Sequence, residues 1–350
     1  MKTFLIYGSY GYTGKLIAEL AVQRGLKPVL AGRSEKRLRS QAASLNLKYR
    51  AFSLDDTPAL YSALRDVEGV LHCAGPFVHT FRQMAEACLV TRRHYLDISG
   101  EIPGFEALAE LNDDAIRADI MLLPGAGFDV VPTDCLAMHL QKRLLSATHL
   151  RLYIRGVRSG FSRGTARSAI ENMQRGGMIR KNKELVQVPP AWRVLEVDFG
   201  RGPVEVVSIG WGDVSTAYYS TGIPTVETYM AFPPIAIQML RAMRVVGSLL
   251  YAKPVKGTLK QALRLMRSGP TEERRRNGFN LIVGEARNDV GGSVSSKLKT
   301  PEGYSLTALA TVEIMERILN GDLKPGFQTP SLAYGSDFIL GFEGVERVDL

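Results

Sequence analysis

Short apolar runs alternate with amphipathic windows through the first third of the chain. The apolar runs predict strands at residues 3–7, 28–31, 70–74, 95–98 and 120–123. Apolar residues at helical spacing predict a first helix that ends at Gly25, followed by helices at about 35–45, 57–67, 78–91 and 105–118. Thr57 is the expected cap of the third helix, because Pro58 then occupies its first position. Strands that alternate with helices indicate βαβ units and a parallel sheet.

From about residue 148 the pattern changes to longer β-rich segments. Strands are expected at 150–157, 193–197, 204–209, 226–232, 279–286 and 293–298, with helices at about 164–176 and 234–267. This pattern predicts a second domain of the α+β class. A length of 350 residues agrees with two domains, because one hydrophobic core rarely serves so long a chain.

Composition excludes several classes of protein. The chain is 45% hydrophobic and 23% charged, which is typical of a globular protein and excludes a disordered or collagen-like one. No apolar run is long enough to span a membrane, and the apolar N-terminal run is too short for a signal peptide. The three cysteines Cys73, Cys88 and Cys135 match no disulfide framework or zinc spacing. We therefore expect a soluble, cytoplasmic protein without a metal site.

A glycine-rich loop separates the first strand from the first helix. It reads Gly8, Ser9, Tyr10, Gly11, Tyr12, Thr13 and Gly14, a GxxGxxG spacing. Such a loop needs glycine for the tight turn, for approach of the backbone to a pyrophosphate and for close packing of helix on strand. The helix N-terminus then offers N–H donors to the phosphates. Its position between a strand and a helix predicts a Rossmann-type dinucleotide site.

The end of the second strand predicts which dinucleotide binds. An NAD site needs an acidic residue there, to accept a hydrogen bond from the ribose 2′-hydroxyl. This chain has Arg33 and Ser34 instead, followed by Lys36 and Arg37. A guanidinium and a hydroxyl suit a 2′-phosphate, so the expected cofactor is NADP(H). The other basic residues of this helix, Arg39 above all, are equally well explained as a solvated helix face.

Several motifs together resemble the saccharopine dehydrogenase-like oxidoreductases. They are the residue 8–14 loop with Arg33 and Ser34, the CAGPF motif at 73–77, HYLDISGE at 94–101, GFDVVPTD at 127–134 and, more weakly, residues 304–335. The middle of the chain, with SRGTA at 162–166 and RGG at 175–177, resembles the branch that contains trans-acting enoyl reductases. The resemblance implies an NADP-binding Rossmann domain at 1–135, on which residues 305–350 pack back, and a substrate domain at 136–304.

The resemblance also implies a reaction. We expect an NADPH-dependent oxidoreductase that transfers hydride to an activated double bond, with the C=C of an enoyl or lipid-like substrate favoured. Two alternatives stay open: reduction of a C=N bond, as in saccharopine-type chemistry, and a non-catalytic, lipid-associated NADP-binding protein. Ala74, Gly75 and Pro76 follow a strand of the sheet, and they are expected to leave room for the nicotinamide ribose.

The catalytic candidates lie at the end of the strand at 95–98. Strand alternation places Tyr95, Asp97 and Ser99 on one face, and Glu101 follows just beyond. A hydride transfer needs a proton donor or acceptor within hydrogen-bond reach, and Tyr95, Asp97 and Glu101 are the candidates. Ser99 is a candidate for substrate contact. Structural roles stay open for all of them: packing for Tyr95, loop capping for Asp97, and the N-terminus of the next helix for Glu101.

Further substrate candidates are Phe128, Asp129 and Arg163, which lie in the motifs shared with the family. Cys73 reads as a buried strand residue rather than a nucleophile. The apolar segment 229–251, with Arg241 and Arg244, predicts a packed helix pair, a dimer face or an amphipathic contact with a membrane surface.

The formal net charge of +9 is concentrated in one segment. Residues 151–183 contain the basic side chains Arg151, Arg155, Arg158, Arg163, Arg167, Arg175, Arg180, Lys181 and Lys183 and one acid, Glu171. Aromatic residues are sparse there, which argues against nucleic acid. The expected partner is therefore an anionic group, such as the cofactor phosphates or an acyl-carrier-bound substrate, with a solvated surface as the alternative.

Overall fold

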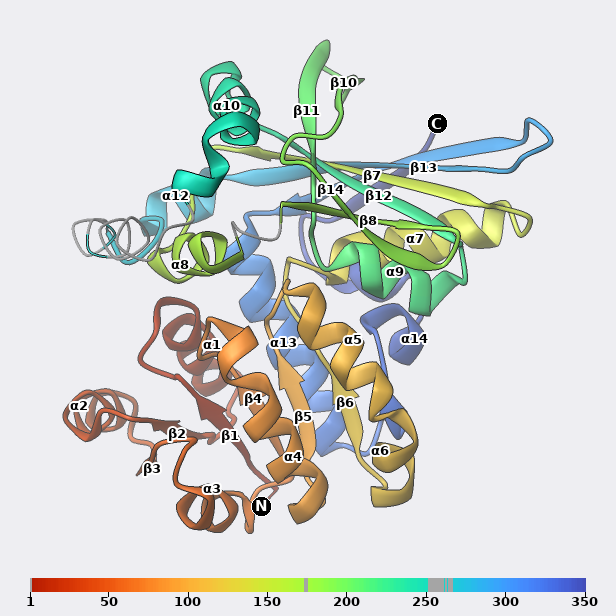
Figure 1. Ribbon diagram of the computed structural model, residues 1–350. Helices are drawn as coiled ribbons and strands as arrows, with labels where there is room; N and C mark the ends of the chain where they lie inside the picture. Colours follow the sequence, from red (N-terminus) through yellow and green to blue (C-terminus); the bar gives the residue numbers. More distant parts are fainter. Residues whose placement is uncertain (1, 173–175, 251–260, 262, 264–266) are drawn as a thin grey trace. The chain divides into compact units, whose positions relative to one another are not determined.

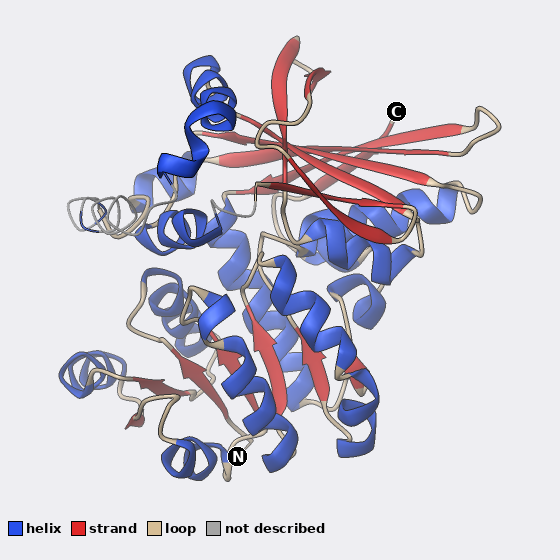
Figure 2. Ribbon diagram, viewed as in Figure 1, coloured by secondary structure: helices blue, strands red, loops and turns tan. Residues whose placement is uncertain are grey.

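The computed structural model describes residues 2–172, 176–250, 261, 263 and 267–350. The chain forms two units, Met1–Val131 with Tyr304–Ala333, and Pro132–Gly303 with Tyr334–Leu350. Each unit is therefore built from two separate stretches of the sequence. Figure 1 shows the elements in chain order and Figure 2 their distribution between helix and strand.

The first unit is a parallel sheet of seven strands with helices on its faces (Figure 2). Its elements are β1 (Phe4–Tyr7), α1 (Tyr12–Gln23), β2 (Val29–Gly32), α2 (Glu35–Leu45), β3 (Tyr49–Ala51), α3 (Thr57–Leu64), β4 (Gly69–His72), the 3-10 turn η1 (Phe77–His79), α4 (Phe81–Thr91), β5 (His94–Asp97), α5 (Ile102–Glu110), α6 (Asn112–Ala118), β6 (Met121–Leu123), α13 (Gly303–Leu319), β15 (Gly326–Phe327) and α14 (Pro330–Tyr334), of which Pro330–Ala333 lie in this unit. The strand order is β15-β6-β5-β4-β1-β2-β3. Six of these strands have the Rossmann order, and β15 extends the edge beside β6.

The central strands form because their side chains are apolar on both faces. All four residues of β1, β2 and β4 are buried, as expected for strands that helices cover on both sides. The predicted Rossmann-type fold is confirmed. The order reverses between β1 and β4, and in such folds ligands bind beyond the carboxyl ends of the strands at this point.

Several local details of the first unit differ from the sequence prediction. The edge strand β3 lacks a buried apolar run, so the hydrophobic pattern did not indicate it. The helix predicted at 105–118 is two helices, α5 and α6, that meet at Leu111. The cap of α3 is Asp56 rather than Thr57, because the Asp56 carboxylate accepts a hydrogen bond from the N–H of Ala59 at 3.1 Å.

The second unit is a mixed sheet of nine strands with helices. Its elements are α7 (Val131–Arg143), β7 (His149–Val157), α8 (Arg163–Asn172), β8 (Gly177–Lys181), β9 (Glu184–Val188), β10 (Val194–Asp198), β11 (Pro203–Ile209), α9 (Asp213–Thr221), β12 (Thr225–Ala231), α10 (Pro234–Leu250), α12 (Glu272–Asn277), β13 (Phe279–Arg287), β14 (Ser293–Pro301), η4 (Phe338–Gly341) and β16 (Glu346–Asp349). The main order is β10-β11-β12-β7-β13-β14-β16, and β8 pairs with β12 and β9.

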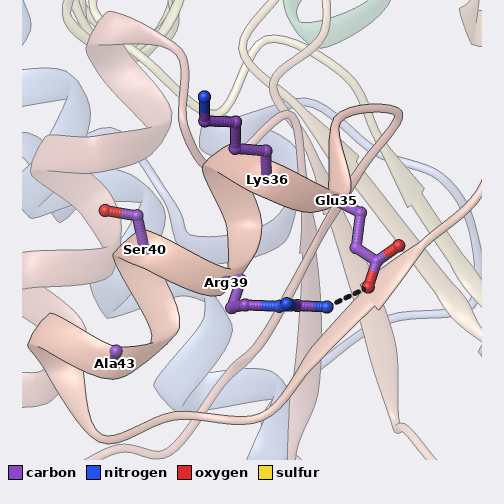
Figure 3. Close-up of a pocket in the computed structure, with 5 residues that line it drawn as sticks. All are labelled: Glu35, Lys36, Arg39, Ser40 and Ala43. Carbon is purple, nitrogen blue, oxygen red and sulfur yellow. Dashed lines mark hydrogen bonds and ion pairs between the residues drawn. The ribbon is translucent and has the colours of Figure 1, made fainter.

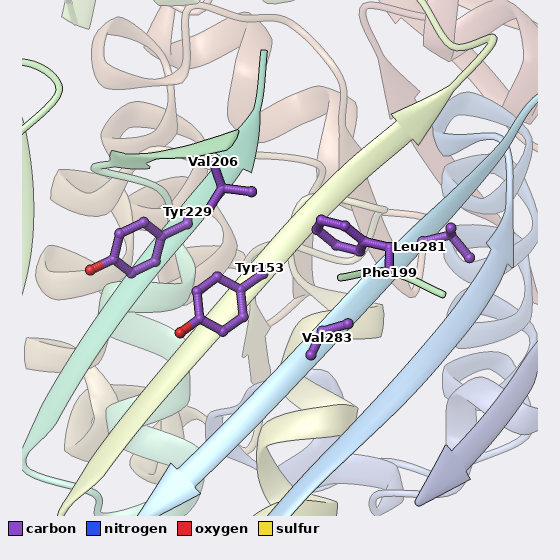
Figure 4. Close-up of a cluster of buried hydrophobic side chains, with 6 residues drawn as sticks. All are labelled: Tyr153, Phe199, Val206, Tyr229, Leu281 and Val283. Atoms are coloured by element: carbon purple, nitrogen blue, oxygen red, sulfur yellow. The ribbon is translucent and has the colours of Figure 1, made fainter. Parts of the chain in front are cut away.

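A cluster of buried side chains lies on one face of this sheet (Figure 4). Tyr153 of β7 and Tyr229 of β12 stand side by side with ring centroids 5.3 Å apart, and Phe199 joins them from the turn after β10. All the strands predicted for this domain are present, whereas β8, β9, β16, α9 and α12 were not predicted. The predicted helix at 234–267 is α10 as far as Leu250, and most of its remainder lies outside the described residues.

The C-terminal stretch divides between the two units. Helix α13 and β15 belong to the first unit, but residues 334–350, which were predicted to pack on that unit, belong to the second. Strand β16 pairs antiparallel with β14. The Asp349 carboxylate also accepts hydrogen bonds from Arg143 at 3.0 Å and Ser296 at 2.7 Å and lies 2.8 Å from His139. These contacts hold the last strand to the second sheet.

Candidate functional site

The glycine-rich loop is shaped by close contacts of its backbone. Gly8 has a φ of +86°, and a Cβ placed on it would lie 3.0 Å from the backbone of Cys73 and Ala74. A Cβ on Gly14 would lie 2.5 Å from the carbonyl oxygen of Gly8, and one on Gly11 would lie 3.1 Å from it. The three glycines therefore allow the tight turn, the approach of the β4 loop and the close start of α1.

A contact that the sequence did not reveal fixes this loop from α2. The fully buried Ser9 hydroxyl donates to Gln41 Oε1 at 2.9 Å, and Gln41 Nε2 donates to the Ser9 carbonyl at 2.9 Å. Gln41 stands in a polar stretch of α2, so its position alone resembles that of a solvated side chain. Farther along the loop, the Tyr12 ring packs edge-on against Tyr304 of α13 with ring centroids 5.0 Å apart.

The turn between β2 and α2 contacts the glycine-rich loop through Tyr10. The phenol oxygen of Tyr10 accepts hydrogen bonds from the backbone N–H groups of Arg33 at 3.1 Å and Ser34 at 3.2 Å. The guanidinium of Arg37 lies over the Tyr10 ring, 5.7 Å from its centroid. Ser34 is the N-cap of α2, and its side chain makes no capping hydrogen bond.

The basic residues of this turn differ from those farther along α2. Within the described part of the chain, no acidic side chain pairs with Arg33, Lys36 or Arg37. Arg39, in contrast, pairs with Glu35 at 2.8 Å on the outer face of the helix, where both line an open depression (Figure 3). The cations at the start of α2 thus lack the ion pair that engages Arg39.

These residues fit NADP(H). The loop and the start of α1 offer backbone N–H groups to a pyrophosphate, because the N-cap Gly11 has no side chain to cap the helix. The end of β2 is followed by Arg33 and Ser34, where an NAD site needs an acidic residue, and the carboxylate of the next residue, Glu35, pairs with Arg39 at 2.8 Å. The loop residues Ser9, Tyr10, Tyr12 and Thr13 all lie in this unit.

The loop after β4 borders the glycine-rich loop. Ala74 contacts Gly8 as described above, Gly75 is exposed, and Pro76 is buried at the start of η1. Buried His72 supports this loop: its Nε2 lies 2.9 Å from Thr80 Oγ1, which donates to the Ala74 carbonyl at 2.9 Å. Burial lowers the pKa of His72 to about 3, so the ring is neutral at physiological pH.

Asp97 is engaged on both carboxylate oxygens. Oδ1 accepts from the N–H groups of Ser99 at 2.9 Å and Gly125 at 2.8 Å, and Oδ2 accepts from the Tyr95 hydroxyl at 2.7 Å. Only 1% of Asp97 is exposed, and this burial raises its pKa to about 6. The pKa of Tyr95, which is fully buried, is raised well above its usual value by burial and by Asp97. The pair links the ends of β5 and β6.

Glu101 connects the loops after β4 and β5. Its two carboxylate oxygens accept hydrogen bonds from the N–H groups of Phe77 at 3.0 Å and Val78 at 2.8 Å. Glu101 is also the N-cap residue of α5, and Ser99 Oγ accepts from its backbone N–H at 2.9 Å. The 6% exposed Glu101 carboxylate therefore fixes the backbone next to the Ala74–Pro76 segment.

Asp129 differs from the other acids of this region. It is half-buried in the loop after β6, and within the described residues its carboxylate has no hydrogen-bond partner. Burial, with a smaller contribution from the negative charge of Glu101, raises the pKa of Asp129 to about 7. Thr307 of α13 anchors the same loop, because its hydroxyl accepts from the N–H of Phe128 at 2.9 Å.

The structure thus brings most of the predicted site residues together in the first unit. The backbone of Ala74 lies against Gly8 of the glycine-rich loop. The Ala74–Pro76 segment precedes η1, whose N–H groups donate to Glu101. The negative charge of Glu101 in turn raises the pKa of Asp129. Ser99, Asp97 and Tyr95 lie behind this surface as a hydrogen-bonded support. Arg163 is exposed at the start of α8 and belongs to the second unit.

The basic segment 151–183 is not one surface. Arg180 is 3% exposed, donates to the carbonyls of Val214 and Lys183, and stacks 4.3 Å from the centroid of the Tyr218 ring. Arg151 lies 3.9 Å from the buried carboxylate of Glu227. Arg175 lies outside the described residues, and the exposed members are Arg158, Arg163, Arg167, Lys181 and Lys183.

The remaining predictions concern the Cys73 thiol, a metal site and contact with a membrane. Burial and the nearby Asp97 raise the pKa of the Cys73 thiol, which keeps it protonated. The described residues include no cluster of three or more His, Cys, Asp or Glu side chains suited to a metal ion. Nor does any helix in the described ranges have the length and apolar character needed to cross a membrane. Ile235 and Met239 of α10 are exposed, and the membrane contact predicted for 229–251 stays a prediction.

Comparison with known protein families bears on the first unit. Residues 4–123 match the family described as the saccharopine dehydrogenase NADP binding domain. This part of the chain is therefore similar to the NADP-binding domain of saccharopine dehydrogenases. The predicted resemblance is confirmed there, and the cofactor is NADP(H).

Known structures and curated proteins extend the comparison. Saccharopine dehydrogenase (L-Glu forming) of Saccharomyces cerevisiae has the same fold, with a TM-score of 0.68 over 100% of both chains at 12% identity. A provisionally named trans-acting enoyl reductase of Mycobacterium tuberculosis is 28% identical over 183 residues, which are 48% of this chain and 43% of that protein. A lipid droplet localized protein of Caenorhabditis elegans is 26% identical over 152 residues, 39% and 36% of the two chains. The chain spans less than half the length of the curated relatives it matches.

Proposed function

We propose that the protein is an NADPH-dependent reductase that transfers hydride to an activated double bond, with Asp129 as the proton donor. The observation that carries the proposal is the state of Asp129. Its carboxyl is half-buried, has a pKa raised to about 7, and makes no hydrogen bond within the described residues. A general acid works best with a pKa near the working pH and with its proton free to move.

The other acids near the NADP site are less suited to this role. Both oxygens of Asp97 accept hydrogen bonds, and both oxygens of Glu101 bind backbone N–H groups. Proton transfer from either would break contacts that hold the loops in place. We therefore propose that Asp97 and Glu101 position the loops of the site, and that Tyr95 and Ser99 stabilise them through their hydrogen bonds.

The reaction balances with one proton from the protein. Bound NADPH supplies the hydride, which carries two electrons to one atom of the double bond. The Asp129 carboxyl donates its proton to the other atom, and the resulting carboxylate takes up a proton from water before the next turnover. The products are the reduced substrate and NADP⁺.

We propose the C=C bond of an enoyl, lipid-like substrate as the acceptor. Its support is the similarity to a protein named as a trans-acting enoyl reductase and to a lipid droplet localized protein, each over part of the chain. An acyl carrier protein is the proposed bearer of this substrate, because Arg158, Arg163, Arg167, Lys181 and Lys183 are exposed in the second unit. Acidic partners are commonly recognised by such surface charges.

Asp129→Asn tests the proposal. The amide removes the exchangeable acidic proton but keeps the shape, so we expect kcat to fall about 100-fold or more while the Kd for NADPH stays within about twofold. NADPH oxidation is measured against a panel of enoyl thioesters and cyclic imines. Asp114→Asn is the matched control, because Asp114 is exposed on α6 and pairs only with Arg117 among the described residues.

The pH dependence gives a second measurement on the same residue. A proton donor must be protonated, and the pKa of Asp129 is raised to about 7. We therefore expect kcat of the wild type to fall as the pH rises through about 7. Oxidation of NADPH by the imines alone would replace the enoyl proposal with C=N reduction. Tight NADPH binding without oxidation by any substrate, or an unchanged rate in Asp129→Asn, would overturn the assignment.

A further inference from the structure

The selectivity of the first unit for NADP(H) depends on more than its cations. We propose that Tyr10 of the glycine-rich loop is a specificity-determining residue, which holds the β2–α2 turn in the conformation that presents Arg33 and Ser34 to the 2′-phosphate. The inference requires NADP(H) as the cofactor and is independent of the reaction proposed above.

The first observation is the pair of hydrogen bonds from the turn to the phenol oxygen. The backbone N–H groups of Arg33 and Ser34 are the first two after β2, and both donate to Tyr10 at 3.1 and 3.2 Å. No backbone carbonyl takes these two hydrogens in the described structure. One side chain from the pyrophosphate loop thus fixes two successive peptide units of the 2′-phosphate turn.

The second observation is the packing around the Tyr10 ring. Gly32, the last residue of β2, leaves the space the ring needs, since a Cβ there would lie 2.7 Å from Tyr10 Cε1. The guanidinium of Arg37 lies over the same ring, 5.7 Å from its centroid. A glycine and a cation therefore both border the Tyr10 ring beside the turn.

A physical consequence follows for recognition of the phosphate. Because a neutral oxygen already accepts the two N–H groups, the 2′-phosphate is left to the side chains of Arg33, Ser34 and Arg37. Those side chains keep their directions only while the turn keeps its shape. Tyr10 thus links two parts of the site. The glycine-rich loop serves the pyrophosphate of NADH and NADPH alike, whereas the β2–α2 turn serves the 2′-phosphate of NADPH.

Tyr10→Phe tests this link by binding alone. The change deletes the shared acceptor and leaves the ring, so the turn loses two hydrogen bonds. We expect the Kd for NADPH and for adenosine 2′,5′-bisphosphate to rise about tenfold, the size expected for one or two neutral hydrogen bonds. The Kd for NADH should change by less than about twofold. Calorimetry with the bisphosphate and fluorescence titration with NADPH and NADH give these values.

Tyr49→Phe is the matched control. It removes the same atom from a nearby phenol, whose oxygen accepts from Arg39 Nε at 3.4 Å and not from the turn. We expect no change in the NADPH to NADH ratio of affinities. Gly32→Ala approaches the same contact from the other side: the added methyl displaces the Tyr10 ring, and the selectivity should fall as in Tyr10→Phe.

Three results would overturn the inference. Equal weakening of NADPH and NADH in Tyr10→Phe would assign Tyr10 to the common part of the cofactor. Unchanged Kd values for both cofactors would show that Tyr10 does not contribute to selectivity. Tighter binding of the bisphosphate would mean that the phenol oxygen competes with the phosphate for the two N–H groups. A thermal melting curve of each variant ensures that only folded protein is compared.

Discussion

Hydrogen-bond partners distinguish acids that share the same region of the sheet. Asp97 is the last residue of β5 and Asp129 lies in the loop after the neighbouring parallel strand β6, and burial raises the pKa of both. Asp97 has three hydrogen-bond donors, whereas Asp129 has none in the described part of the molecule. These contacts favour a positioning role for Asp97 and support the proposal of Asp129 as the proton donor.

A buried histidine at the end of β4 predicts a pH effect on stability. The pKa of His72 is lowered to about 3 by burial, against about 6.5 for an exposed histidine. Between these values the unfolded chain binds a proton that the folded chain does not, so stability is lost as the pH falls from 6.5 towards 3. In His72→Gln this loss is absent, a difference of about 1 kcal/mol per pH unit.

Urea unfolding followed by circular dichroism at several values between pH 6.5 and pH 4.5 measures this difference. His72→Gln keeps an N–H that can donate to Thr80, so the Ala74 loop should remain in place at pH 7. Parallel curves of unfolding free energy against pH for the two proteins would contradict the assignment of a neutral, buried ring.

The sequence predicted the types of these residues but not their roles. Alternation along β5 placed Tyr95 and Asp97 on one face, where they form a hydrogen bond. Asp129 was predicted as a substrate contact, because nothing in its neighbours along the chain indicates that its carboxylate lacks a partner. Gln41 was not predicted as a site residue, because its contacts with Ser9 join residues that are distant in sequence.

At the scale of elements, Glu101 couples the loops after β4 and β5. Its carboxylate binds two N–H groups of η1, and its charge raises the pKa of Asp129. If Asp129 is the proton donor, Glu101→Gln should make it more acidic, because a negative neighbour is removed. We therefore expect the falling limb of the kcat profile to move to lower pH.

The profile of kcat against pH is the readout, since a loss of structure alone would lower the rate at every pH without moving the limb. Glu110→Gln, at the exposed far end of the same helix α5, is the control and should leave the limb in place. If the falling limb does not move in Glu101→Gln, the charge of Glu101 does not act on the proton donor, and the expected coupling of the two carboxyls is wrong.

The hydrophobic pattern predicted the central elements well and the edges poorly. Strands β1, β2, β4 and β5 are buried on both faces, so an apolar run identifies them. Strand β3 and the β8–β9 hairpin are half-exposed, and pairing across the sheet rather than their own composition makes them strands. Such pairing is not visible in one sequence.

At the scale of the molecule, exposed positive charge in the second unit predicts an acidic partner. Arg167→Glu with Lys181→Glu should raise KM for a carrier-bound substrate by about tenfold and leave a free thioester unaffected. Arg180 is unsuitable for such a test, because its buried contacts hold the second unit together. Steady-state kinetics with both substrates measures the difference.

Lys27→Glu, an exposed charge reversal in the first unit, is the control and should change neither KM. Equal effects of the double reversal on the carrier-bound and the free substrate would refute carrier recognition. A loss that disappears in moderate salt would support it, because contacts between exposed charges are screened.

The strand β15 completes the first sheet with residues that are synthesised long after β6. It pairs with β6, yet the whole of 132–303 is synthesised between them. On the ribosome, the nascent nucleotide-binding unit therefore has an open edge at β6 for roughly ten to forty seconds. An uncovered edge strand is a template for pairing with other chains. A chaperone that covers this edge during translation would prevent such pairing. The nucleotide-binding unit is complete only after residues 304–333 have been synthesised.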